Sequence, residues 1–324
     1  MHDSSLPAVH LKTLHFQLGN LKKFPITGDF AREAESSQIP FGRKSYQLCK
    51  SLTSSSAEQT ARLKDLLKPL IEIANEICES NIPVFALLPA TSPQRLTEGL
   101  RPFTDQEFIL NYSRLHVYQQ GNCAFAAAGK RLKDYLDKGQ KVLVIAADSP
   151  QPKGNRPVDF SQHYCEGSLA VLFEPSTTGL RYITSHLEYQ HDSQIEVSAH
   201  SLLCEKAFNS ISENTSRRSL VYAANSIGTD DEEKGQLIHS AWSNQADLPE
   251  MILPFKTLGE LGCMEGLVKL LWQQQQNLQN RLLKNALLIN SESFSSWRAV
   301  QVWEYLEDTT AATSHMTNSG NDHG

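Results

Sequence analysis

The segment between residues 115 and 148 carries the strongest structural signal, and it reads LHVYQQGNCAFAAAGKRLKDYLDKGQKVLVIAAD. We expect a strand at residues 115–120, followed directly by Gly121-Asn122-Cys123. Apolar residues then recur at helical spacing as far as Lys138-Gly139, where a glycine after a lysine-bearing last turn is a helix-stop signal. The apolar run at residues 142–147 predicts a buried strand. The segment therefore predicts strand, helix and strand in succession.

A similar succession returns in the second half of the chain. Around the first segment we expect strands at residues 9–17, 83–88 and 168–174, a helix at 60–78 and a short helix at 105–112. Further on we expect strands at residues 219–224, 251–255, 285–290 and 298–305, and helices at 200–211, at 231–242 and from Gly259 onward. Two halves of matching element order predict a duplicated α/β fold whose strands pack between helices.

The expected organisation has three parts. We expect an N-terminal half at residues 1–178 and a C-terminal half at residues 179–306. Residues 307–324 contain Thr, Ser, Asn and Gly with almost no apolar side chain, so we expect a disordered tail there.

Composition excludes several classes of protein. The chain has 324 residues, of which 40% are hydrophobic and 20% charged, values typical of a globular protein and not of a disordered or fibrous one. The formal net charge of −6 gives no electrostatic reason for a nucleic-acid partner. No apolar run approaches the roughly 20 residues that span a bilayer, and the first residues do not resemble a signal peptide. We expect a soluble, cytoplasmic protein.

The metal-binding and cofactor motifs of common enzyme classes are missing from the sequence. Its 6 cysteines include no C-x-x-C pair, so we expect neither a zinc site nor a disulfide framework, and most of these cysteines should be reduced core residues. The 11 histidines include no H-E-x-x-H pair, and there is no G-x-S-x-G, Walker or G-x-G-x-x-G sequence. The sequence predicts no metal and no cofactor.

Cys123 is open to two interpretations. It begins a helix directly after a strand, where free backbone N–H groups and the positive end of the helix dipole favour a thiolate and hence a nucleophile. The alternative is a small residue packed between a strand and an alanine-rich helix, where larger side chains do not fit.

Several motifs in matching order resemble those of the thiolase-fold β-ketoacyl synthases, over about residues 83–302. The segment from Gly121 to Asp148 resembles the one in which a cysteine opens the nucleophile helix. The further matches are Arg156-Pro157-Val158-Asp159 with R-P-F-D, Glu166-Gly167-Ser168 with E-G-A, Asn225-Ser226-Ile227-Gly228-Thr229 with H-G-T-G-T, Lys256 with Gly259-Glu260 and Gly266 with K-x-x-x-G-H-x-x-x-x-x-G, and Asn290-Ser291 with N-S-F-G-F-G-G. The resemblance implies a thiolase-like duplicated fold of five layers, αβαβα.

The reacting groups of that family are replaced in this chain. In the family a cysteine takes the acyl chain, and two histidines hold the malonyl thioester oxygen during decarboxylation. When the helix-ending glycine is matched to Gly139, the nucleophile position falls on Asn122. The two histidine positions fall on Asn225 and Glu260 in the H-G-T-G-T and K-x-x-x-G-H matches. An amide is not a usable nucleophile, and a carboxylate opposes the negative charge that an oxyanion site must stabilise. A shift of one residue restores Cys123 as nucleophile but leaves both histidine positions empty.

The resemblance therefore implies a chain-length factor of a type II polyketide or aryl polyene pathway, or of a fatty-acid-like one. Such a subunit is non-catalytic and pairs with an active ketosynthase, and in the family the strand that corresponds to residues 115–120 pairs across the two-fold axis of the dimer. Acyl carrier protein is expected to contact the pair through the partner. Tyr112, Tyr118 and Phe125 are candidates for the tunnel wall or the subunit interface, or else for core packing. The alternative function is an active condensing enzyme or acyltransferase with Cys123 as nucleophile.

Overall fold

The computed structural model describes residues 8–18, 56–78, 81–90, 114–149, 166–189, 199–210, 219–222, 250–252, 261–278, 285–291 and 297–306. The elements of the first part of the chain are β1 (Ala8–Leu18), α2 (Ser56–Cys78), β2 (Val84–Leu87), β3 (Leu115–Tyr118), η2 (Gly121–Cys123), α4 (Ala124–Leu136), β4 (Val142–Asp148) and β5 (Gly167–Ser176). Those of the second part are β6 (Gly179–Tyr189), α5 (Ala199–Phe208), β7 (Ser219–Tyr222), β8 (Glu250–Ile252), η3 (Gly262–Met264), α8 (Glu265–Leu278), β9 (Asn285–Ser291) and β10 (Trp297–Leu306).

The strand order repeats itself. The described strands form one sheet in the order β3-β2-β4-β5-β1-β6-β10-β9-β7-β8. In the first five, β2 runs parallel to β3 and β4, whereas β5 runs antiparallel to β4 and β1. In the second five, β7 runs parallel to β8 and β9, whereas β10 runs antiparallel to β9 and β6. The two sets meet where β1 and β6 pair through Val9 and Leu180.

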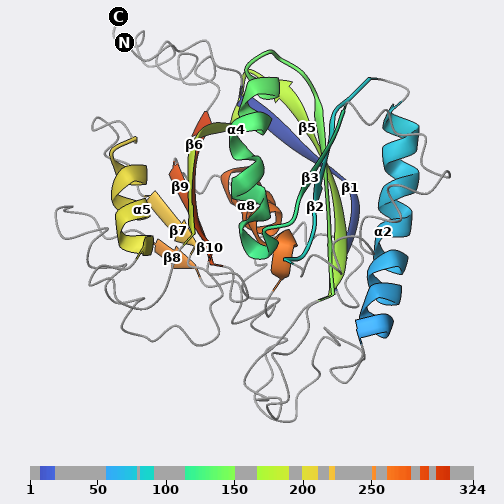
Figure 1. The fold of residues 1–324 in the computed structure, drawn as a ribbon. Coiled ribbons are helices and arrows are strands. Elements are labelled where there is room, and N and C mark those ends of the chain that lie inside the picture. The colour runs from blue at the N-terminus through green and yellow to red at the C-terminus, as the bar shows by residue number, and fades with distance from the viewer. Residues whose placement is uncertain are drawn as a thin grey trace, which may run out of the picture.

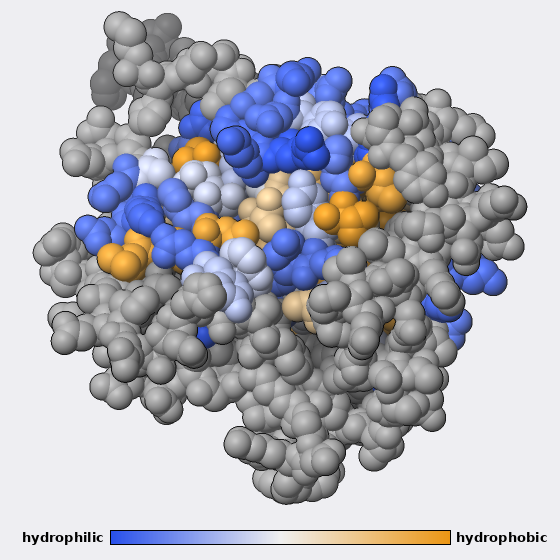
Figure 2. Space-filling model, in the orientation of Figure 1, coloured by the Kyte–Doolittle hydropathy of each residue, from blue (hydrophilic) through white to orange (hydrophobic). Residues whose placement is uncertain are grey.

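The helices complete five layers, in the αβαβα order that the sequence predicts (Figure 1). Helix α2 packs on β4 and β5 from outside, and α5 packs on β6 and β10. Between the two sets of strands lie α4, which contacts β2, β3 and β4 on one side and β6 and β10 on the other, and α8. Seen from the same side, hydrophilic side chains cover the outer end of α4, and apolar ones show only as small separate patches (Figure 2).

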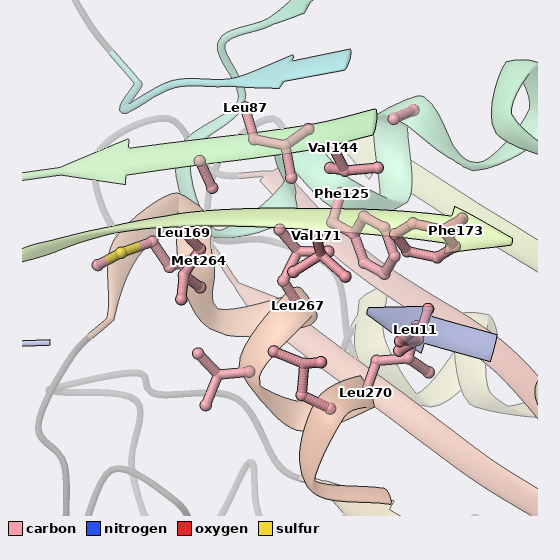
Figure 3. Close-up of a cluster of buried hydrophobic side chains, with 14 of the residues drawn as sticks. Leu11, Leu87, Phe125, Val144, Leu169, Val171, Phe173, Met264, Leu267 and Leu270 are labelled. Atoms are coloured by element: carbon pink, nitrogen blue, oxygen red, sulfur yellow. The ribbon is translucent and has the colours of Figure 1, made fainter. Parts of the chain in front are cut away.

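The main core surrounds the two central helices. Figure 3 shows Met264 of η3 and Leu267 of α8 lying against Leu169 and Val171 of β5. On α4 the largest core-facing side chain is Phe125, which is wholly buried; Ala124, Ala128, Leu132 and Leu136 of the same helix also face this core. A second apolar cluster fills the space between α2 and the outer face of β2, β4 and β5; its fully buried members include Leu67, Leu70, Val84, Leu143 and Ala170.

Two features differ from the sequence analysis. Strand β6 was not predicted, because polar side chains such as Ser185, His186 and Glu188 interrupt its apolar pattern and most of the strand is only half-buried. The helix expected from Gly259 begins later, with the turn η3, where Gly262 has φ +57°. Gly259 itself, the expected helices at residues 105–112 and 231–242, and the tail at 307–324 lie outside the described residues.

Candidate functional site

Two similar turns lie at the centre of the molecule, one before each central helix. In η2, Gly121 has φ +54°, and in η3, Gly262 has φ +57°. Each glycine opens a three-residue 3-10 helix that leads directly into α4 or α8, and the two turns contact each other. A left-handed φ favours glycine because other residues pay a steric penalty there. Asn122 and Cys263 thus hold matching positions, each directly after the turn glycine.

The turn η3 is fixed by buried hydrogen bonds to the N-terminal strands. The Oδ2 atom of Asp148, at the end of β4, accepts the backbone N–H of Cys263 at 2.9 Å. The Cys263 thiol shares its one proton between the carbonyl oxygens of Leu87 (3.2 Å) and Ala147 (3.1 Å). A donating sulfur must keep its proton, so these contacts hold Cys263 as a neutral thiol with a structural role. Sequence analysis gave no role to Cys263 or Asp148, because the contact joins residues more than 100 positions apart.

The turn η2 holds the two residues at which the sequence analysis looked for a nucleophile. Asn122 is 2% exposed and Cys123 is fully buried. The N–H of Cys123 donates to the carbonyl oxygen of Gln120 at 3.0 Å. The Cys123 side chain belongs to a small apolar cluster at the C-terminal strands; the other members are Ala126, Leu187, Trp297 and Ala299. Both positions therefore lie at the start of the central helix, and Cys123 is tightly packed there.

A buried ion pair lies close to this turn. Lys269 Nζ contacts Glu265 Oε1 one helical turn away on α8, with side chains that are 0% and 1% exposed. Desolvation lowers the pKa of Lys269, while the charge of Glu265, its hydrogen bond to Lys269 and the charge of Cys123 act in the opposite direction. Cys123 is thus within electrostatic reach of Lys269. Sequence analysis missed this pair, because Glu and Lys four residues apart on a helix usually form a solvated surface contact.

Of the other candidate residues from the sequence analysis, the structure describes Tyr118 and Phe125. Tyr118 is half-buried, and its ring stacks on Phe85 with centroids 5.8 Å apart. Phe125 stacks on Trp303 at 6.0 Å within the main core. Tyr112, Asn225 and Glu260 lie outside the described residues, so the arrangement of the three replaced positions stays a prediction.

No metal site emerges among the residues that the structure describes, since no three His, Cys, Asp or Glu side chains are grouped as ligands. Within the same residues, none of the helices combines the length and the apolar character needed to cross a membrane.

The sequence matches neither a protein-family model nor a curated protein. The fold does match solved structures. One is 3-oxoacyl-[acyl-carrier-protein] synthase III from Aquifex aeolicus VF5, with 12% identity and a TM-score of 0.52 over 91% of this chain and 100% of that one. Another is a glutamate-to-glutamine variant of OleA from Xanthomonas campestris, with 10% identity and a TM-score of 0.50 over 92% and 99% of the two chains. The chain therefore has the thiolase fold of such ketosynthase-like enzymes, as the sequence analysis predicts.

Proposed function

We propose that this chain is a non-catalytic ketosynthase-like subunit, of the chain-length-factor type, that pairs with an active β-ketoacyl synthase and shapes its acyl tunnel. The observation that carries the proposal is Asn122, a buried amide in the turn that opens the central helix α4. A nucleophile at this place must offer a reactive electron pair, and an amide nitrogen offers none. The subunit keeps the scaffold of a condensing enzyme, but the position at the start of its helix α4 does not carry out condensation.

The packing around the adjacent residue supports this proposal. Trp297, the first residue of β10, packs against the cluster that contains Cys123. The β-ketoacyl synthases that this chain resembles have a glycine-rich loop that lets the backbone approach an acyl thioester, and Ser295-Ser296-Trp297-Arg298 replaces that loop here. A tryptophan at that place fills volume that a substrate would need, which is in keeping with a structural role.

One observation favours the second candidate, an acyltransferase or condensing enzyme with Cys123 as nucleophile. Lys269 is near enough to Cys123 for their charges to interact. A neighbouring ammonium group stabilises a thiolate and so activates a cysteine. The same ammonium is already paired with Glu265, which reduces that effect, so the non-catalytic function stays the better supported one.

An acylation experiment separates the two functions. The purified full chain is incubated with acetyl-, hexanoyl- and malonyl-thioesters and analysed by intact mass and peptide mapping, beside Cys123→Ala and, as a matched control for a buried thiol, Cys263→Ala. A non-catalytic subunit gives no adduct in any of the three proteins. A stable adduct that maps to Cys123, disappears in Cys123→Ala and persists in Cys263→Ala would establish the second candidate instead.

The pairing part of the proposal rests on β3. In the described chain no strand pairs with the outer edge of β3, and an open edge is available to a strand of another chain. The family resemblance assigns pairing across a two-fold axis to this strand. Expression of the chain together with the ketosynthases of its own genome should yield an equimolar pair with one of them, and acyl carrier protein is expected to dock mainly on that partner. The proposal is contradicted if none of these ketosynthases co-purifies with the chain.

A further inference from the structure

The charge of the chain is unevenly distributed, which the net charge conceals. Residues 114–141, which contain β3 and α4, carry six Lys or Arg and two Asp, a net charge of +4. The whole chain carries −6, so all other residues together carry −10. The side chains of Lys130, Arg131 and Lys138 in this region are exposed. Figure 2 shows a hydrophilic area over α4.

Two arginines of this region flank the open edge strand. Arg114 directly precedes β3, and it donates a hydrogen bond to the carbonyl oxygen of Asn81. Arg131 of α4 contacts His116 of β3, with 3.2 Å between its Nη1 atom and Nδ1 of the imidazole. Among the described residues, no carboxylate lies within ion-pair distance of either guanidinium. Both guanidinium groups are therefore held beside the edge of β3, and no carboxylate of the described residues forms an ion pair with them.

These contacts also give the surface a defined shape. The Nε2 atom of His116 lies 3.1 Å from the Tyr135 hydroxyl, and the His116 ring meets Phe85 edge-on with centroids 4.9 Å apart. His116 thus holds Arg131 through one nitrogen and Tyr135 through the other. A positioned guanidinium can form two parallel hydrogen bonds with one carboxylate, which adds specificity to the charge attraction.

A symmetric pair of this chain would oppose its own charges. In a two-fold pairing across β3 the same surface contributes from both copies, so residues near the axis meet their own equivalents. Arg131, beside His116 in the middle of β3, would then approach its own equivalent, while Arg114 at the start of the strand would face the far end of the other copy's strand and add to the positive charge of both surfaces. Like charges brought together at an interface cost several kcal/mol. The edge is therefore unfavourable for a homodimer and favourable for an acidic surface.

We infer that the β3 edge, with Arg114 and Arg131, is a selectivity surface that rejects a second copy of this chain and accepts a partner with Asp or Glu side chains facing the two arginines. This inference rests on the proposed function, and it names the chemistry of the ketosynthase partner. An acidic protein fits better than a nucleic acid, because the −10 carried by the rest of the chain repels a long polyanion.

The test uses two forms of the full chain and requires no identified partner. Wild-type chain, the Arg114→Glu/Arg131→Glu variant and their equimolar mixture are compared by sedimentation velocity at low and high salt. The mixture places arginines opposite glutamates, so it should form a 1:1 dimer at least about tenfold tighter than either protein alone, and salt should weaken that dimer. Lys64→Glu/Lys68→Glu is the matched control, since it reverses two exposed charges on α2; mixed with wild type, it should show no gain.

Each outcome decides the inference. A mixture that associates no better than its components overturns it, and so does a wild-type homodimer that the Arg114→Glu/Arg131→Glu substitutions leave unchanged. Thermal melting of both variants verifies that they are folded. If the mixture dimerises but no ketosynthase co-purifies with the chain, the proposed function fails while the surface inference stands. If a ketosynthase co-purifies and the reversed arginines do not weaken the complex, the inference fails alone.

Discussion

The carboxylate of Asp148 accepts the backbone N–H of Cys263, with 2.9 Å between Oδ2 and the nitrogen. Both residues are buried, and they lie far apart in the sequence: Asp148 ends β4, whereas Cys263 lies in the turn that opens α8. The carboxylate therefore compensates free N–H groups at the start of a central helix. Together with the contacts of the Cys263 thiol to Leu87 and Ala147, this hydrogen bond ties η3 to the N-terminal strands.

Gly262 makes this contact possible, and its replacement should be costly. A Cβ atom at Gly262 would lie 2.0 Å from Oδ2 of Asp148, and the residue also has φ +57°. We predict that Gly262→Ala lowers the free energy of unfolding by about 3 kcal/mol or more, from the left-handed backbone together with displacement of the carboxylate.

Gly139→Ala is the matched control for the backbone contribution. Gly139 has φ +68°, and nothing lies within 4 Å of the Cβ position. Its substitution should therefore cost only about 1–2 kcal/mol. Urea denaturation of both variants measures the difference, and equal costs would show that the Asp148 contact contributes nothing.

The buried pair of Glu265 and Lys269 should be sensitive to the loss of either member. Lys269→Met leaves a buried carboxylate without its counter-ion, and Glu265→Gln does the same to the ammonium. Each single variant should lose about 3–5 kcal/mol of stability, whereas the double variant Glu265→Gln/Lys269→Met should lose much less than the sum. A double-mutant cycle measured by denaturant unfolding tests this, and additive losses would contradict a coupled pair.

Most helices and strands could be predicted because their patterns depend on residues that are close together in the sequence. The helical spacing before Gly139, the apolar run of β4 and the apolar face of α2 each depend only on neighbours along the chain. The contacts of the candidate site depend on distant residues instead. Asp148 and Cys263 are more than 100 positions apart and meet only in the folded chain, and the approach of Lys269 to Cys123 has no local pattern. Sequence thus predicts the position of Asn122 and Cys123 at a helix start, but not what surrounds them.

The crossing of the two central helices should show strong coupling between Phe125 and Gly266. A Cβ atom on Gly266 would approach Cδ1 of Phe125 to 2.7 Å, and the Phe125 ring is fixed by stacking on Trp303. We predict that Gly266→Ala costs about 1–3 kcal/mol through overpacking. Phe125→Leu creates space at the same contact, so Gly266→Ala should cost clearly less in that background. An undiminished cost in the double variant, measured by thermal and urea unfolding, would mean that the ring does not limit the approach of the helices.

Acid should destabilise the fold in the range where histidine titrates. Burial lowers the pKa values of His15, His116 and His186 below the ordinary 6.5; nearby Arg131 adds to this effect for His116, and Lys206 for His186, where Glu188 partly opposes it. The unfolded chain therefore binds more protons than the folded one near and below pH 6.5, so stability is fully present above that pH and falls as the pH decreases towards the folded pKa values. Urea unfolding between about pH 7.5 and 5.5 should show this decline, and His15→Gln/His116→Gln should make it shallower. An identical decline in the double variant would assign the acid sensitivity to other groups.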